Sequence, residues 1–250
     1  MKSLVLLSGG LDSTVCLAKA IEDEEQRESV PPKVHALTFR YGSKHGGVEL
    51  RAAQDVTRWY EVPWHILNLD QWWFGNESAL LMGSLTEIPE GSYRAVRERG
   101  HKLTSIIPFR NGVFLSIAVA FAAARDFDRV YLATHKADGD EWAYPDCSTP
   151  FLRAFGLAAF YGTGEQVAVR FPFIRVSKPD VVREGIRLQA PMHLTWSCYN
   201  PIYSVPNDRV AKSEPPIAHH CGVCPTCIDR IRAFEGAELE DPTRYAGRSS

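Results

Sequence analysis

The stretch that decides the fold of this chain is LVLLSGGLDST, residues 4–14. Its first four residues are apolar, which is typical of a parallel strand that is buried on both faces. Gly9 and Gly10 then allow the backbone to turn sharply, and no Cβ covers their N–H groups. The following residues have a helical pattern, and the N–H groups and dipole at a helix N-terminus favour an anion. The stretch therefore predicts a strand, a phosphate-binding turn and a helix.

The side chains of the turn indicate which class of phosphate-binding site it forms. Ser8, Ser13 and Thr14 add hydroxyl donors. The turn has no lysine, so it is not the P-loop of kinases and GTPases, and it lacks the Gly-x-Gly-x-x-Gly spacing of dinucleotide-binding folds. The alternative is an ordinary tight turn without a ligand. We favour the anion site, because two glycines, two serines and an acid seldom share such a turn without one.

The composition excludes several classes of protein. A chain of 250 residues suits one large α/β domain with an appendage, or two small domains. A net charge of −2 argues against a general nucleic-acid binder. No apolar run approaches the roughly 18 residues of a membrane span, and the chain starts in a core strand instead of a signal peptide. We expect a cytoplasmic protein with no nucleic-acid or membrane partner, whose cysteines are reduced.

Apolar segments alternate with helical patterns along the chain. The segments expected to be strands are residues 4–7, 33–39, 62–69, 129–134 and 167–173. Helices are expected after the turn and at residues 49–60, 113–125, 151–161, 178–189 and 228–234, with Ser177 as the N-cap of the helix at 178. This rhythm predicts an α/β fold with a doubly wound, mostly parallel five-stranded sheet.

An irregular stretch at about residues 70–107 interrupts this rhythm. It contains Trp72-Trp73-Phe74 and a basic group formed by Arg94, Arg97, Arg99, His101 and Lys102. A connection of this length without regular structure is either functional or mobile. Two interpretations stay open, a lid that closes over an anionic substrate and a solvated insertion.

The last third of the chain carries a cysteine cluster with the spacing C-x22-C-x2-C-x2-C, formed by Cys198, Cys221, Cys224 and Cys227. Four thiolates without an open position predict a structural metal site, and Zn²⁺ prefers such a tetrahedron. An iron–sulfur cluster is the competing interpretation. We favour zinc, because Gly222 and Pro225 make a compact knuckle and no other redox feature is visible. His219 and His220 are expected to be exposed neighbours, whereas Cys16 and Cys147 are expected to be small packed residues.

The turn Ser8-Gly9-Gly10-Leu11-Asp12-Ser13 resembles the SGGxDS signature of the PP-loop, or N-type, ATP pyrophosphatases. That superfamily has the adenine nucleotide alpha hydrolase-like fold, cleaves ATP between the α and β phosphates and transfers AMP. The resemblance therefore implies ATP as the ligand of the turn.

A longer series of motifs resembles the 7-cyano-7-deazaguanine synthase family, also called preQ0 synthase or QueC, of the pathway to queuosine and other 7-deazapurines. In chain order the motifs are SGGLDST at 8–14, RYGxxH at 40–45, RNxxFLS at 110–116, YPDC at 144–147, PFxxxSK at 172–178, TWSCY at 195–199 and CGxCxxC at 221–227. They cover nearly the whole chain. The order of the motifs is far more discriminating than the first turn alone.

The resemblance implies an ATP-dependent ligase that forms a C–N bond. The carboxylate of 7-carboxy-7-deazaguanine would be adenylated, ammonia would displace AMP to give the amide, and a second activation and dehydration would give the nitrile. ATP, Mg²⁺ and Zn²⁺ are the implied cofactors, and a homodimer is expected.

The resemblance also implies roles for individual residues. Those expected to bind ATP are Ser8, Gly9, Gly10, Leu11, Asp12, Ser13 and Thr14. The catalytic candidates are Asp12, which would also lie near Mg²⁺, Ser13, Lys178 and Arg110. Candidates for the deazaguanine pocket are Tyr41, His45, Arg110, Asn111, Tyr144 and Asp146. We expect Arg110 to pair with the substrate carboxylate and Asp146 to read the guanine-like N–H edge.

The implied organisation is a PP-loop ATP pyrophosphatase domain at residues 1–190 and a small zinc-binding C-terminal region at 191–250. Three departures from the family pattern concern the product, and one of them is that the insertion at about 70–107 has no motif that can be assigned. The family more often has Asp-Tyr-Gly-Gln where this chain has Arg40-Tyr41-Gly42-Ser43, and an insertion at 200–220 separates the first cysteine from the others. A branch that stops at the amide, or joins the activated acid to another amine or a protein acceptor, stays open.

Two rival functions also stay open. A tRNA thiolase or another amidotransferase of the superfamily would carry redox-active cysteines or a basic RNA-binding domain, and neither is visible. A zinc-stabilised, non-catalytic nucleotide-binding partner of another enzyme is the second rival. The intact SGGLDST motif argues against such a degenerate protein.

Overall fold

Strand β1, Lys2–Leu6, lies at the centre of the fold and pairs in parallel with a strand on each side. The computed structural model describes residues 1–27, 33–99, 103–140, 144–204 and 216–246. Its main sheet has the order β3-β2-β1-β4-β5, with β2 Lys33–Arg40, β3 Trp64–Asn68, β4 Arg129–Tyr131 and β5 Ala168–Arg170. All four pairings are parallel. The predicted five-stranded α/β sheet is therefore confirmed.

The apolar run of β1 is explained by burial on both faces. Leu4 pairs with His35 of β2 and with Val130 of β4, and both Leu4 and Val5 are completely buried. Val5 packs into a core on one face of the sheet, and Leu4 packs into a second core on the other. A strand with two covered faces cannot alternate with polar residues, so its sequence is continuously apolar.

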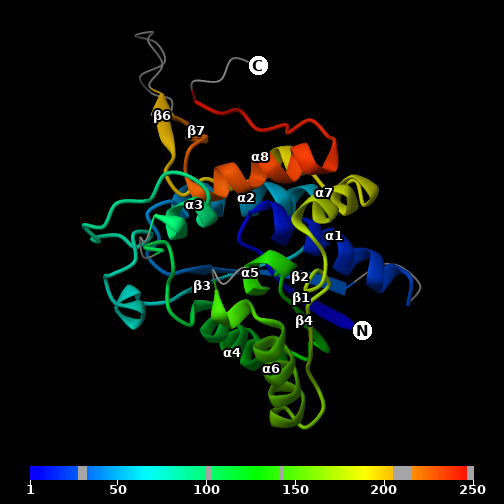
Figure 1. The fold of residues 1–250 in the computed structure, drawn as a ribbon. Coiled ribbons are helices and arrows are strands. Elements are labelled where there is room, and N and C mark those ends of the chain that lie inside the picture. The colour runs from blue at the N-terminus through cyan, green and yellow to red at the C-terminus, as the bar shows by residue number, and fades with distance from the viewer. Residues whose placement is uncertain (28–32, 100–102, 141–143, 205–215, 247–250) are drawn as a thin grey trace.

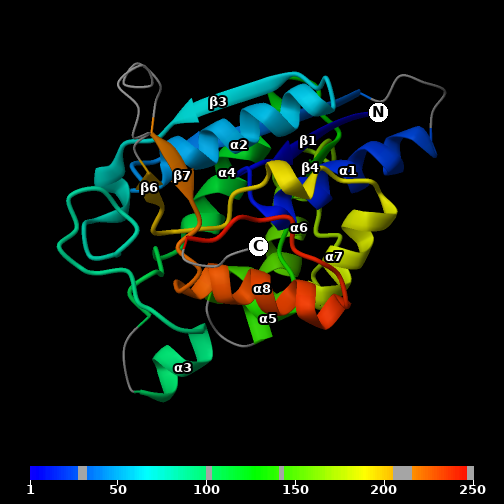
Figure 2. The ribbon, with the colours of Figure 1, turned by 90° about the horizontal axis from the view of Figure 1, so that it is seen from above.

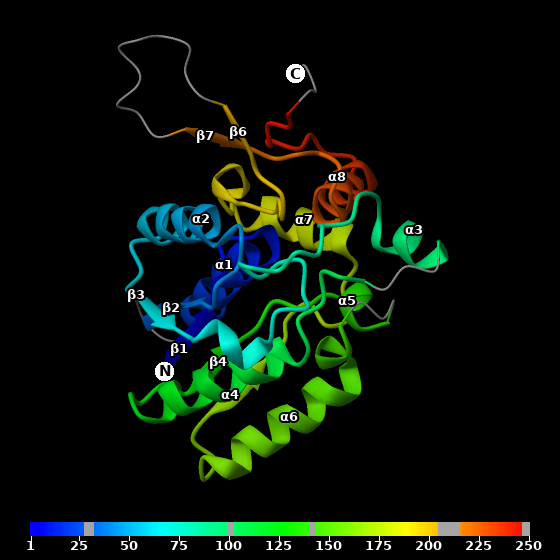
Figure 3. The same ribbon diagram turned by 90° about the vertical axis from the view of Figure 1, so that its left-hand side faces the viewer.

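Helices cover both faces of the sheet and make three layers (Figures 1 and 3). The helices that contribute to the core on the Val5 face are α1 Leu11–Glu25, α2 Gly46–Trp59, α7 Lys178–Arg187 and α8 Pro225–Ala237. The helices on the opposite face are α4 Arg110–Ala123 and α6 Thr149–Gly162. None of the described helices is both long and apolar enough to cross a membrane.

The remaining elements are short. They are the helices α3 Tyr93–Glu98 and α5 Lys136–Asp140, the 3-10 turns η1 Gln71–Phe74, η2 Pro145–Cys147 and η3 Met192–Leu194, and an antiparallel pair of β6 Ile202–Ser204 and β7 Ile217–His219. The predicted N-cap at Ser177 is confirmed, because its side chain accepts a hydrogen bond from the Asp180 N–H.

The C-terminal helix α8 belongs to the same core as α1 and α7. Ala233, Phe234 and Ala237 pack in that core, and Figure 2 shows α8 lying beside α7. Arg230 is completely buried, pairs with Asp241 at 3.1 Å and thereby ties the following segment to the helix. The C-terminal region that carries three of the four cysteines thus packs directly on the sheet domain, while the boundary expected at residue 190 stays a prediction.

The stretch at 70–107 is partly inside the protein. Ala79, Leu80 and Leu81 are completely buried, whereas Trp72 and Trp73 are 71% and 66% exposed. The stretch is therefore not a fully solvated insertion, and its role as a lid stays a prediction. His101 and Lys102, and the side chain of Arg97, lie outside the described residues.

Gly9 provides a direct test of the turn after β1. Its φ is +84°, and a Cβ there would lie 2.5 Å from the Glu49 carbonyl oxygen and 2.6 Å from the Ala53 nitrogen, both main-chain atoms of α2. We expect Gly9→Ala to lower the free energy of unfolding by about 3 kcal/mol, because strain at positive φ adds to this clash. Thermal unfolding followed by circular dichroism should show a midpoint lower by about 9 °C.

The matched control is Gly47→Ala in α2, where a Cβ would meet nothing within 4 Å. Its midpoint should stay within about 2 °C of that of the wild type. Equal midpoints for the two variants would contradict the close approach of the turn to α2.

Candidate active site and metal centre

A cavity of about 380 Å³ lies at the carboxyl ends of β1, β2 and β4. It is lined by residues 6–8 at the end of β1, by residues 37–42 at the end of β2 and in the loop after it, and by residues 132–134 after β4. The chain leaves β1 toward β2 and β3, whereas β4 and β5 lie on the other side of β1. Ligands of open α/β sheets bind at such a switch point.

The turn after β1 is closed by its own hydroxyl groups. The Ser13 hydroxyl donates to the Gly10 carbonyl at 3.0 Å and accepts from the Ser8 N–H at 3.2 Å. The two serine hydroxyls lie 3.1 Å apart. The N-cap residue of α1 is Gly10, which has no side chain to cap the helix, and its own N–H donates to the Ser8 hydroxyl at 3.2 Å. The first turn of α1 thus lacks a side-chain cap from its N-cap residue, which suits an anion site.

The predicted ATP-binding residues divide into two groups. Ser8, Asp12 and Ser13 line the cavity. The other four, Gly9, Gly10, Leu11 and Thr14, are not among its lining residues. Gly9 packs against α2, and Leu11 and Thr14 are buried. In the structure, these four residues shape the backbone of the turn.

Lys178 enters the cavity from the first position of α7. Its Nζ lies 2.5 Å from an oxygen of Asp229 and 3.4 Å from Asp12 Oδ2. Burial alone would lower the pKa of Lys178, but the carboxylates of Asp12, Asp229 and Asp138 outweigh it and raise the pKa above its usual value. The cavity therefore holds a permanently charged ammonium group beside the turn.

Asp12 is ionised for the reciprocal reason. Burial alone would raise its pKa, but the charge of Lys178, helped by His135, lowers it below the usual value. Its second oxygen, Oδ1, is buried without a hydrogen-bond partner among the described residues. A buried carboxylate oxygen of this kind suits a hard cation such as Mg²⁺.

Arg110 has no acidic partner in the described part of the chain. Its guanidinium nitrogens reach the Tyr41 hydroxyl and the Asn111 side-chain oxygen, each at 3.4 Å, and its Nε is buried without a partner. Burying a cation without an anion is costly. Because Arg110 also lines the cavity, this part of the site suits an anionic ligand that accepts two hydrogen bonds.

Three tyrosines surround the same part of the cavity. The Tyr144 hydroxyl lies 3.2 Å from that of Tyr93 and 3.5 Å from that of Tyr199. Burial raises the pKa of all three phenols, so they are neutral groups that both donate and accept. Tyr93 lies in α3 of the irregular stretch. No periodicity or spacing in the sequence indicated it, and only its contact with Tyr144 reveals it.

Two predicted pocket residues do not face the cavity. Asp146 is buried, and its Oδ2 accepts from the N–H groups of Asn111 and Gly112 at 2.7 and 3.3 Å. This carboxylate oxygen therefore caps the N-terminus of α4, and the expectation that Asp146 also reads the substrate stays a prediction. Cys147 accepts from the Asn111 amide at 3.0 Å, and burial raises the pKa of its thiol, in agreement with the expected packed residue.

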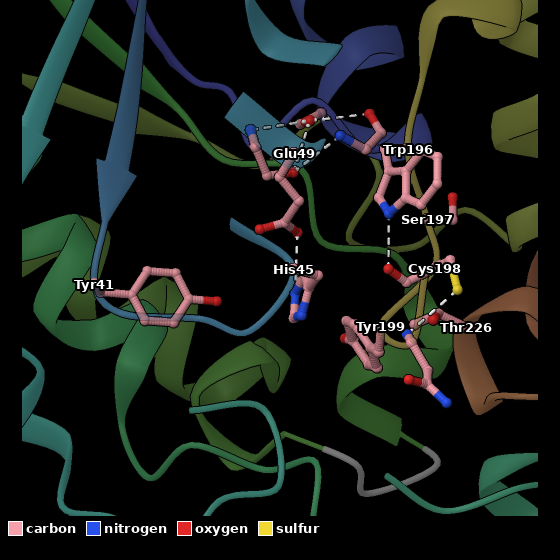
Figure 4. A network of polar contacts seen from close by, with 12 residues as sticks. Tyr41, His45, Glu49, Trp196, Ser197, Cys198, Tyr199 and Thr226 are labelled. Carbon is pink, nitrogen blue, oxygen red and sulfur yellow. Dashed lines mark hydrogen bonds and ion pairs between the residues drawn. The ribbon is translucent and has the colours of Figure 1, made fainter. Parts of the chain in front are cut away.

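His45 is the second of these residues, and it lies behind the cavity wall. It is 1% exposed, its Nε2 lies 3.4 Å from Glu49 Oε1, and its ring centroid is 4.9 Å from that of Tyr199 (Figure 4). Glu49 and Tyr199 line the cavity, but His45 does not. His45 contacts these two neighbours, and its expected contact with the substrate stays a prediction.

The four predicted cysteines come together. All four Sγ atoms lie within 4.8 Å of one another, with Cys221 and Cys227 3.9 Å apart and Cys198 and Cys224 4.0 Å apart. A single tetrahedral ion with metal–sulfur bonds of about 2.3 Å sets its sulfurs about 3.8 Å apart. Main-chain N–H groups of residues 200, 221 and 224 donate to these sulfurs, which stabilises thiolates. The cluster could therefore bind one metal ion.

The neighbouring histidine departs from the prediction. His220 was expected to be exposed, but it is 5% exposed. Its Nε2 accepts from the Ser197 N–H at 3.0 Å, and its ring lies 4.1 Å from that of Trp196. Figure 4 shows Trp196, whose Nε1 donates to the Cys198 carbonyl. The histidine thus supports the segment that carries the first cysteine.

Comparisons with known proteins agree with this geometry. A family model described as "Queuosine biosynthesis protein QueC" matches residues 2–238. A 7-cyano-7-deazaguanine synthase of Porphyromonas gingivalis is 34% identical over 245 residues, covering 98% of this chain and 97% of that protein. The protein of the same name from Brucella anthropi is 36% identical, with coverages of 98% and 94%.

A solved structure shares the fold. The U34-tRNA thiolase NcsA from Methanococcus maripaludis, described with its 4Fe–4S cluster, aligns with a TM-score of 0.50 at 15% identity. The match covers 81% of this chain and 62% of that chain. A likeness at this identity concerns the fold alone.

The capping contact of Asp146 leads to a prediction. Asp146→Ala should lower the free energy of unfolding by about 2 kcal/mol, because it leaves two buried N–H groups of α4 without an acceptor. The thermal midpoint should fall by about 6 °C. Asp146→Asn keeps one acceptor oxygen and should lose about half as much. A midpoint unchanged in Asp146→Ala would contradict the capping role.

Proposed function

The chain belongs to the queuosine biosynthesis protein QueC family, and from this premise we propose that it converts 7-carboxy-7-deazaguanine into 7-cyano-7-deazaguanine with ATP and ammonia. One observation carries the proposal. A single cavity joins a turn suited to phosphate, beside the charged Lys178, to a half-buried arginine that has no acidic partner among the described residues. Ammonia as the nitrogen donor and a homodimer are parts of the proposal that come from the family resemblance, and a cytoplasmic location is the expectation from the sequence.

The first half of the reaction makes a leaving group. A carboxylate does not react with ammonia, because oxide would have to leave. In the proposed reaction a carboxylate oxygen attacks the α-phosphorus of ATP, and the bond from that phosphorus to the bridging oxygen of pyrophosphate breaks. Arg110 would orient the carboxylate through two N–H groups. Ser8, Ser13 and the first turn of α1 would bind the phosphates, and Lys178 would balance the charge that develops on pyrophosphate.

The second half forms and then dehydrates the amide. The ammonia nitrogen attacks the activated carbonyl carbon, the carbon–oxygen bond to AMP breaks, and a proton is lost. The amide oxygen would then attack the α-phosphorus of a second ATP and release pyrophosphate. The carbon–oxygen bond to AMP breaks, and the loss of AMP and of both N–H protons gives the nitrile. Tyr93, Tyr144 and Tyr199 would supply neutral hydrogen-bonding groups around the deazaguanine ring, where no charge has to be balanced.

Two metal ions belong to the proposal. Mg²⁺, when bound, supplies positive charge shared with the phosphate oxygens, and Asp12 with its free Oδ1 would hold it. Zinc is proposed for the cysteine cluster, because the sulfur separations of 3.9 and 4.0 Å fit a single tetrahedral ion. A four-iron cluster carries a separate iron under each thiolate, which spreads the sulfurs further apart.

A product assay tests the function. Purified protein is incubated with ATP, Mg²⁺, ammonium and 7-carboxy-7-deazaguanine, and AMP and the product mass are followed. We expect AMP release that depends on the acid, and the mass of the nitrile. Arg110→Lys should lower kcat/KM for the acid about a hundredfold, since an ammonium cannot replace a bidentate guanidinium, while the KM for ATP changes little.

The other outcomes distinguish the alternatives. The amide mass, or a conjugate with another amine or a protein, would show that the chain belongs to a branch with a different product. No AMP release with this acid would contradict the proposed substrate. A folded Arg110→Lys variant with an unchanged KM and kcat for the acid would contradict the role of Arg110.

Metal analysis tests the zinc proposal. Elemental analysis of the purified protein should find one zinc per chain, and Cys224→Ser should reduce the zinc content below half and lower the thermal midpoint, because a structural metal contributes directly to folding. Iron in place of zinc, or a folded protein without metal, would overturn it.

A further inference from the structure

Asp229, in the first turns of α8, lies in the cavity and has no role in the reaction as proposed so far. Its Oδ2 accepts from Lys178 Nζ at 2.5 Å, nearer than Asp12 at 3.4 Å. We propose that Asp229 is a positioning residue, which fixes the Lys178 ammonium group beside the phosphate-binding turn. The inference rests on the proposed function, because it assumes that ATP binds at this turn.

The backbone around this pair is held closely. Lys178 begins α7, and the next residue, Pro179, packs against Gly236 of α8, where a Cβ would lie 2.9 Å from the proline Cγ. Arg183 of α7 also donates to the Gly236 carbonyl at 2.6 Å. These direct contacts set the distance between α7 and α8. As a consequence, the Asp229 carboxylate meets the Lys178 ammonium group.

The metal centre holds the other end of α8. Cys224 is the N-cap of this helix, and Cys227 precedes Asp229 by two residues. Thr226, between the two cysteines, lines the cavity together with Asp229. The turn that presents Asp229 to Lys178 is thus the same turn that supplies two of the four sulfurs.

The charges explain why Lys178 needs a second anchor. Asp12 and Asp138 also face the cavity and attract the ammonium group. Without Asp229, Asp12 becomes its nearest carboxylate. The ammonium group would then move toward Asp12 and away from the phosphates, and it would neutralise the carboxylate that the proposal assigns to Mg²⁺. Asp229 has the opposite effect, because it holds the charge at a fixed distance from Asp12.

A double-mutant cycle tests this role without turnover. The affinity of the intact protein for α,β-methylene-ATP with Mg²⁺ is measured by calorimetry for the wild type, Asp229→Asn, Lys178→Met and the double variant. We expect Asp229→Asn to raise the Kd of the nucleotide analogue about tenfold, because the displaced Lys178 would lose one charge-assisted hydrogen bond to phosphate. In the Lys178→Met background the same change should not weaken binding, and removal of an unpaired carboxylate near the phosphates should strengthen it.

The control is Glu235→Gln, which removes an exposed carboxylate from the same helix and should leave the affinity unchanged. Zinc content and thermal midpoint, measured for every variant, report on folding. The proposal is overturned by tighter binding in Asp229→Asn alone, since Asp229 would then only compete with phosphate for Lys178. It is also overturned by equal losses in both backgrounds, since a general structural effect does not depend on Lys178.

The cycle separates this inference from the proposed function. The binding measurements need neither the deazaguanine acid nor ammonia. They can therefore still be interpreted if the product assay finds no product with that acid. A wild-type protein that does not bind the nucleotide analogue would overturn both the nucleotide part of the proposed function and the positioning role.

Discussion

The closeness of the turn after β1 to the backbone of α2 is the constraint on which the rest of the site depends. Only a glycine fits at residue 9, where φ is positive and two main-chain atoms of α2 occupy the space of a side chain. The Gly9 carbonyl also accepts from the Trp196 N–H at 2.8 Å. This turn therefore joins the centre of the sheet, the helix α2 and the segment that leads to Cys198.

The two cations of the cavity have opposite surroundings. Lys178 lies among three carboxylates and keeps its charge because they outweigh the cost of burial. Arg110 lies among phenols and an amide, with no carboxylate in contact in the described part of the chain. The charge of Lys178 is already balanced by carboxylates of the protein. The charge of Arg110 is not, so a bound ligand would have to supply the anion. In the proposed function, this difference assigns the phosphates of ATP to the part of the cavity at Lys178 and the substrate carboxylate to the part at Arg110.

The cysteine cluster is connected to both parts of the cavity by residues that are close to its cysteines in the chain. Tyr199 follows Cys198, and Asp229 follows Cys227 by two residues. The irregular stretch is attached to the same centre, because the Gly91 N–H donates to the Val223 carbonyl at 2.9 Å, two residues before Tyr93. A metal ion here would therefore stabilise the walls of the cavity as well as the C-terminal helix.

The sequence by itself determined the strand, turn and helix at residues 4–14, the order of the five strands along the chain and the four cysteines, because periodicity, glycine and cysteine spacing are local signals. It also indicated Arg110 and Lys178 through their motifs. Only the tertiary structure decided that Asp146 caps α4, that His45 and His220 are buried supports, and that Tyr93 and Asp229 enter the cavity. The physical reason is distance along the chain. Tyr93 meets Tyr144, and Lys178 meets Asp229, across 51 residues in each case, and no local pattern states which side chains such packing will bring together.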